Sequence, residues 1–148
     1  MVTAVPFDPA AKRVFVINTA SGAEDAGAKR GVIEAALAAH GRQGELVMCP
    51  PDALPRVAAE AAAQAAARHS AVIAVGGDGS LNTVAQAAHA AGCAMGVIPY
   101  GTFNYFARTH GIPTDPAAAA RQLLEASPSP VQVAAINERL FLVNASLG

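Results

Sequence analysis

The sequence predicts an α/β fold: a three-layer, doubly wound, mostly parallel sheet with flanking helices, ending in a short β-hairpin. Short apolar runs alternate with segments of helical spacing. The first, third and fourth runs are almost continuously apolar, which is typical of strands covered on both faces. Strand, helix and strand, repeated along the chain, indicate right-handed crossovers in a parallel sheet. At 148 residues the chain fits one domain.

Each element follows from its own residues. Strands are expected at Arg13 to Asn18, Gly44 to Cys49, Ala71 to Val75 and Ala94 to Ile98. Crossover helices are expected at Glu24 to His40, Leu54 to Arg68 and Leu81 to Ala91, where residues 81, 84, 85 and 88 form one apolar face. After Pro113, Thr114 or Asp115 can cap a further helix that runs to Glu125, with Pro116 in its first turn. The hairpin is expected at Val131 to Ile136 and Leu140 to Ser146.

Composition excludes several classes of protein. The formal net charge is −1 and the basic residues are scattered, so the sequence predicts neither nucleic-acid binding nor a charge-driven membrane patch. The N-terminus has Asp8 and two prolines where a signal peptide needs a basic start and an apolar run. The longest uncharged stretch, Gly79 to Ala107, is too polar to cross a bilayer. We therefore expect a soluble, cytoplasmic protein.

Cysteines and histidines give no metal signature. Cys49 and Cys93 form no CxxC pair and are expected to be small buried apolar residues. The four histidines lack HxxxH spacing and are expected at the surface: His40, His69, His89 and His110.

The strongest functional signal is the segment Gly76-Gly77-Asp78-Gly79-Ser80, between the third apolar run and the helix from Leu81. Ligands of open α/β sheets bind at this position. Glycines let a phosphate approach the backbone, and the N–H groups and dipole of a helix start favour an anion. The alternative is a tight turn with Ser80 as N-cap, and we expect Ser80 to cap in either case. Three glycines around one aspartate exceed what a turn requires, so the segment predicts phosphate binding.

Asp78 needs its own explanation, because a carboxylate repels a polyphosphate. A cation between the two, or an aspartate that orients an incoming hydroxyl, would remove the conflict, and both roles suit phosphoryl transfer. The segment is neither a Walker A motif nor a GxGxxG fingerprint.

Two further loops are expected at the same edge of the sheet. One runs from Pro99 to Asn104, where Thr102 and Asn104 offer polar groups to phosphate, ribose or metal-bound water. Arg108 could reach a phosphate or could be a helix C-terminal cation. The other loop runs from Asn18 to Gly22 and presents Ser21 and Gly22 at a helix start. Three polar, glycine-bearing loops at one end of three parallel strands predict a single site.

These motifs resemble the catalytic domain family of the diacylglycerol kinases, which also includes sphingosine and ceramide kinases and bacterial lipid kinases. The resemblance rests on GGDGS, IPYGTFNYFARTHGIP and the earlier NTASG, and it extends from Asn18 to Gly148. It implies the N-terminal-domain fold shared with NAD kinases and phosphofructokinases. It also implies ATP and Mg²⁺ as cofactors and a lipid alcohol as the phosphate acceptor.

The resemblance assigns roles to individual residues. It implies that Gly76 to Ser80 bind phosphates, that Thr102 contacts the nucleotide, and that Cys49 or Pro50 lines its site. Asp78 is the candidate catalytic residue, and no metal ligands are assigned. Thr83 and Tyr105 stand where the family commonly has glutamate and aspartate. The candidate nucleotide-binding residues are Asn18, Ser21, Gly22, Cys49, Gly76, Gly77, Asp78, Gly79, Ser80, Asn82, Thr102 and Asn104.

Family members continue past a segment like FLVNASLG into a β-sandwich that holds the lipid, the proposed base and metal ligands. The chain ends at Gly148 directly after an apolar strand, so we expect residues 1–148 to be a nucleotide-binding catalytic domain without that sandwich. Alone, such a domain should bind nucleotide but transfer phosphate poorly. An ordinary terminus at a sheet edge is the alternative.

The leading interpretation is an ATP-dependent lipid kinase. An NAD kinase-like phosphotransferase is the alternative enzyme, although the GTFN and FAR residues disfavour it. A non-catalytic nucleotide-binding module is favoured by Thr83 and Tyr105, and a purely structural domain would leave the three loops unused. The expected partners are ATP and a lipid alcohol, without nucleic acid. Transient membrane contact through the second domain and a homo-oligomer are also consistent with this interpretation.

Overall fold

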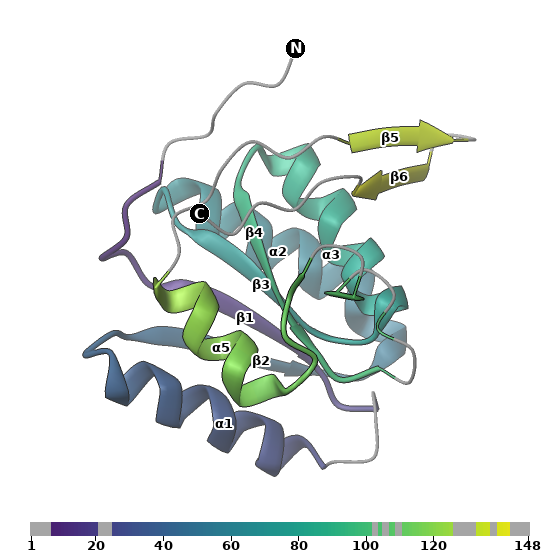
Figure 1. The fold of residues 1–148 in the computed structure, drawn as a ribbon. Helices are drawn as coiled ribbons and strands as arrows, with labels where there is room; N and C mark the ends of the chain where they lie inside the picture. Colours follow the sequence, from purple (N-terminus) through teal and green to yellow (C-terminus); the bar gives the residue numbers. More distant parts are fainter. Residues whose placement is uncertain are drawn as a thin grey trace.

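The fold was analysed in a computed structural model of the chain. It describes residues 7–20, 25–101, 104, 107–108, 111–125, 133–136 and 139–142, the last two ranges by their backbone. The sequence-predicted α/β architecture is confirmed within these ranges (Figure 1).

The central sheet has four parallel strands in the order β2-β1-β3-β4. Their bounds are β1 Arg13–Asn18, β2 Gly44–Cys49, β3 Ala71–Gly76 and β4 Ala94–Pro99. The first two match the predicted ranges, and the other two each extend one residue further. All residues of β1 and β3 are buried, as their continuous apolar runs predict, whereas β2 is half-buried at the sheet edge.

The helices begin at local caps or after short turns. Helix α1, Ala26–Ala39, starts where Asp25 Oδ1 accepts a 2.8 Å hydrogen bond from Ala28 N, two residues later than predicted. A 3₁₀ turn, Pro51–Ala53, leads into α2, Leu54–Ala67. Helix α3, Asp78–Ala91, ends at Gly92, whose φ of 71° is left-handed. Helix α5, Pro116–Glu125, is capped by Asp115, one of the two expected caps.

The helices cover both faces of the sheet. Helices α1 and α5 lie on one face and contact each other, while α2 and α3 pack together on the opposite face (Figure 1). The side chains of each strand alternate between the two layers. Val14 and Val16 of β1 join the core beneath α2 and α3, whereas Phe15 and Ile17 join the core beneath α1 and α5. Ligands of doubly wound folds bind at the carboxyl ends of the strands, between the two helical layers.

The C-terminal strands form the predicted hairpin. Strand β5, Val133–Ile136, pairs antiparallel with β6, Arg139–Leu142, and β6 contacts α3. The second strand begins one residue before its predicted start. None of the helices in the described part of the chain has the length and apolar run that crossing a bilayer requires.

Candidate functional site

The candidate residues gather at the carboxyl edge of the sheet. Asn18, Gly76 and Pro99 are the last residues of β1, β3 and β4, and Gly76 pairs directly with Pro99. The predicted convergence of three segments at one edge is therefore confirmed for the described residues. Ser21, Gly22 and Thr102, which the sequence also assigns to the site, lie outside the described residues.

The start of α3 differs from the sequence prediction. The helix begins at Asp78 rather than Leu81, with Gly77 as an N-cap that makes no side-chain capping bond. Its first internal hydrogen bond runs from Leu81 N to Gly77 O over 3.0 Å. The prediction that Ser80 is the N-cap is therefore wrong, because Ser80 already lies in the first turn. Amides of that turn are directed out of the helix end, where they suit an anion.

Ser80 instead ties α3 to β1. Its side chain is buried, and its Oγ accepts a 2.8 Å hydrogen bond from Asn18 Nδ2. The Oδ1 atom of Asn18 accepts a second bond from Ala20 N, at 2.9 Å. Asn18 thus fixes both the loop after β1 and the first turn of α3. Two candidate residues that are 62 positions apart in the sequence therefore form one buried contact.

Gly77 and Gly101 bring the second loop against the first. A Cβ atom built on Gly101 would lie 2.5 Å from Gly77 Cα, and one built on Gly77 would lie 3.0 Å from Gly101 Cα. Tyr100 N also donates to Gly76 O over 2.9 Å. Side chains at either glycine would collide with backbone, so the two segments approach this closely only because both residues lack a Cβ atom. Gly77, which the sequence predicts to let a phosphate approach, therefore also has a packing role that the sequence pattern does not indicate.

Asn104 shapes the second loop from within. Its φ is 51°, in the left-handed region that asparagine tolerates, and its Oδ1 accepts a 2.9 Å bond from Gly101 N. Its backbone oxygen accepts from Arg108 N at 3.0 Å, and the Arg108 side chain is exposed. The oxygen of the Asn104 side-chain amide, a group that the sequence offers to a ligand, is therefore engaged within the loop.

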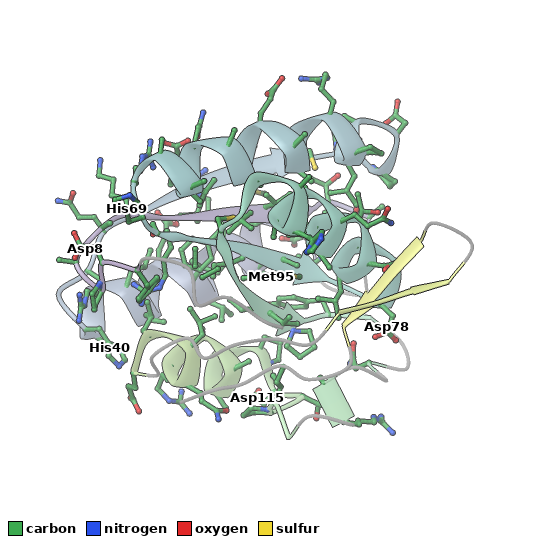
Figure 2. The ribbon with its side chains drawn as sticks, turned by 90° about the horizontal axis from the view of Figure 1, so that it is seen from above. Asp8, His40, His69, Asp78, Met95 and Asp115 are labelled. Carbon is green, nitrogen blue, oxygen red and sulfur yellow. The ribbon has the colours of Figure 1, made fainter. Side chains whose placement is uncertain are left out.

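Asp78 and Gly79 form the solvent-facing part of the site. Asp78 is half-buried at the first position of α3, and Gly79 is exposed, with nothing within 4 Å of a Cβ built there. Asn82 is half-buried and lies four residues after Asp78, one turn along the same side of the helix. Figure 2 shows Asp78 at the opposite end of the molecule from Asp8, His40 and His69. Among the described residues, nothing crowds position 79 at the helix start.

Cys49 lies near the site but faces the core. It pairs with Asn18 in the sheet, and its backbone oxygen accepts a 3.0 Å bond from Thr19 N. The side chain is buried beneath α2, and this burial raises the pKa of its thiol. The backbone oxygen of Cys49 therefore helps to position the loop after β1. The prediction that Cys49 is a small, buried apolar residue is confirmed. Pro50, the other residue proposed here, is exposed.

The residues present fit a polyphosphate with a bound cation. Within the described ranges, no three His, Cys, Asp or Glu side chains come together as a metal site. A Mg²⁺ ion commonly takes only one or two protein carboxylates and completes its shell with phosphate oxygens and water. Asp78, in the first turn of α3, would supply one such carboxylate. Thr83 stands where the family commonly has glutamate. Its Oγ1 donates a 3.2 Å hydrogen bond to Gly79 O, one turn earlier in α3.

Comparisons with known proteins identify the family of this chain. Residues 12–136 match the family model described as "Diacylglycerol kinase catalytic domain". The chain therefore belongs to the diacylglycerol kinase catalytic domain family, as the sequence motifs predict.

Individual relatives agree with this assignment. The protein named "Probable lipid kinase YegS-like" of Pseudomonas aeruginosa (strain UCBPP-PA14) is 44% identical over 85 residues, which are 56% of this chain and 28% of the relative. Its namesake in Klebsiella pneumoniae (strain 342) is 39% identical over 79 residues, 52% of this chain and 27% of the relative. A crystal structure of a diacylglycerol kinase from Bacillus anthracis str. Sterne matches with a TM-score of 0.74 and 26% identity. That match covers 88% of this chain and 47% of the other, so the chain spans about half the length of the solved relative.

Proposed function

We propose that this chain is the nucleotide-binding catalytic domain of an ATP-dependent lipid kinase. The reaction transfers the γ-phosphoryl group of ATP to a hydroxyl of a lipid such as diacylglycerol. The observation that carries the proposal is the half-buried carboxylate of Asp78 at a glycine-flanked helix start. This carboxylate lies at the sheet edge where β1, β3 and β4 end, in a chain of the diacylglycerol kinase family.

Each part of the site has a task in this reaction. The amides at the start of α3 bind phosphate oxygens, and Gly79 leaves the space that they require. Asn18 and Ser80 hold that turn against β1, while Gly77 and Gly101 fix it against the second loop. Asp78 would hold Mg²⁺ or orient the acceptor hydroxyl. When bound, Mg²⁺ neutralises charge on the phosphates.

Under this proposal, the lipid that accepts the phosphate binds in a second domain. The chain covers 47% of the Bacillus anthracis structure, and the resemblance implies a β-sandwich in the remainder. We therefore expect the 148-residue domain to bind Mg-ATP but to transfer phosphate poorly by itself. In the cell we place the enzyme in the cytoplasm, where the second domain would contact the membrane transiently to reach its lipid.

The test compares two aspartates in the full-length enzyme. Asp78→Asn removes the charge at the proposed site, whereas Asp115→Asn is a matched control at the start of α5, because asparagine caps a helix as well as aspartate. Figure 2 labels both residues. With radiolabelled ATP and diacylglycerol micelles, we expect Asp78→Asn to lower kcat at least about 100-fold, the effect of losing one electrostatic group in a site. Asp115→Asn should retain normal turnover.

Three results would count against the proposal. Normal turnover of Asp78→Asn would remove the assigned role of that carboxylate. Phosphorylation of NAD in preference to diacylglycerol would favour the NAD kinase-like alternative. Calorimetric binding of ATP without turnover of any lipid alcohol by the full-length protein would indicate a nucleotide-binding module instead.

A further inference from the structure

Lys29 is a buried lysine on α1. Its side chain is 0% exposed and is among the largest fully buried side chains of the described residues. Its neighbour Arg30 lies in solvent and pairs with Glu34 at 3.4 Å, as is usual for a basic residue on a surface helix. Lysine is rarely buried completely, because removing an ammonium group from water is costly unless polar groups receive it. The position of this ammonium therefore requires a reason.

The ammonium joins the ends of two strands that flank β3. Lys29 Nζ donates a 3.0 Å hydrogen bond to Asn18 O at the end of β1. It also lies 5.3 Å from the ring centroid of Tyr100, the residue that follows β4. In the strand order, β1 and β4 are the two neighbours of β3, and β3 ends at Gly76. The charge therefore lies next to the strand end from which the glycine segment begins.

The same contacts connect Lys29 to the first turn of α3. Asn18 receives the ammonium through its backbone oxygen and donates from its side chain to Ser80 Oγ over 2.8 Å. Tyr100 donates from its backbone nitrogen to Gly76 O over 2.9 Å. Asn18 and Tyr100 thus both contact the segment from Gly76 to Ser80 directly. A charge held in the interior is screened less by water and salt than a surface charge, so it acts on a nearby anion more strongly.

We propose that Lys29 is a positioning residue with an electrostatic role: its buried ammonium holds the ends of β1 and β4 and provides fixed positive charge behind the phosphate-binding turn. This inference rests on the proposed function, because it assumes that a polyphosphate binds at the start of α3. Lys29 does not touch the nucleotide. It acts through Asn18 and Tyr100 and through its charge.

The test measures how the effect of Lys29 depends on phosphate charge. Calorimetry gives the Kd of the 148-residue chain for Mg-ATP, Mg-ADP and AMP. Lys29→Met removes the charge and keeps an unbranched side chain of similar length, and Arg30→Met is the matched control on the exposed side of α1. We expect Lys29→Met to weaken Mg-ATP binding about tenfold, Mg-ADP binding less and AMP binding least, since charge interactions scale with the charge of the ligand. Arg30→Met should bind all three like the wild type.

Folding is checked by urea denaturation of each variant. If Lys29→Met does not fold, Lys29→Gln takes its place, because glutamine removes the charge and keeps an N–H donor. Equal losses for all three nucleotides, or no loss, would overturn the inference and leave a structural role for Lys29. The proposed function would then still stand, because the wild type binds Mg-ATP. A wild-type chain that binds no Mg-ATP would overturn both.

Discussion

The contact between Gly77 and Gly101 makes a quantitative prediction for Gly101→Ala. The added Cβ would lie 2.5 Å from Gly77 Cα and 3.1 Å from Asn104 Oδ1. Carbon atoms are in favourable contact at about 3.5–4.0 Å, so the two backbone segments would have to separate by roughly 1 Å. Such overpacking costs about 1–3 kcal/mol of the free energy of unfolding. The separation also displaces the first turn of α3, so we expect weaker Mg-ATP binding.

Gly31→Ala is the matched control for that substitution. Gly31 lies exposed within α1, and a Cβ built there meets nothing within 4 Å. Alanine should therefore stabilise the chain by up to about 1 kcal/mol through helix propensity, without an effect on nucleotide binding. Urea denaturation gives the free energy of unfolding, and calorimetry gives the Kd for Mg-ATP. If Gly101→Ala matches the wild type in both measurements, close approach of the two glycines does not constrain the site.

Two further predictions concern hydrogen bonds, one within the candidate site and one at the end of α1. Asn18→Ala leaves the buried Ser80 hydroxyl without its donor and should cost about 1–3 kcal/mol of unfolding free energy by urea denaturation, with weaker Mg-ATP binding. A cost below about 0.5 kcal/mol would contradict the role given to that bond. The His40 ring contacts Glu125 Oε2 at 3.0 Å and Ala36 O at 2.9 Å. Both hydrogen bonds raise the pKa of His40, and the bond to Glu125 has the larger effect. Because the folded pKa exceeds the unfolded value of about 6.5, this stabilisation is full below that pH and is lost as pH rises through the folded pKa. In denaturation at several pH values, Glu125→Gln should reduce this pH dependence, and an unchanged profile would exclude the pair as its source.

The sheet could be predicted closely from the sequence. Apolar runs with clear boundaries predict the limits of β1 and β2 correctly. For β3 and β4 the predicted range ends one residue before the strand does. These runs are local signals, since a strand buried on both faces needs apolar residues at nearly every position. The edge where the loops meet followed from topology alone, because the carboxyl ends of parallel strands share one side of a sheet.

The start of α3 could not be predicted in the same way. Glycine, aspartate and serine have low helix propensity, so local rules moved the start to Leu81. The structure places Ser80 inside the helix, where its hydroxyl meets Asn18 from a different part of the chain. The contact between Gly77 and Gly101 is also non-local. Such tertiary partners have no signature in the residues next to them.

Lys29 is a different case, because a local signal for its burial was present. It precedes Ile33 by four residues and Leu37 by eight, and all three are buried on α1. A basic residue within the apolar stripe of a helix is the pattern that would have indicated a buried charge.

The contacts of Asn18 show how the segments at the carboxyl edge of the sheet are held together. This residue accepts from Lys29 on one face of the sheet and donates to Ser80 on the other, and its Oδ1 holds the loop after β1. Gly77 and Gly101 join the remaining loop to the same turn by direct backbone contact. The positions of the amides that we propose to bind phosphate are therefore set by buried contacts within the protein. A site fixed in this way loses less conformational entropy when its ligand binds, so binding free energy remains available for aligning the triphosphate with the acceptor that we assign to the second domain.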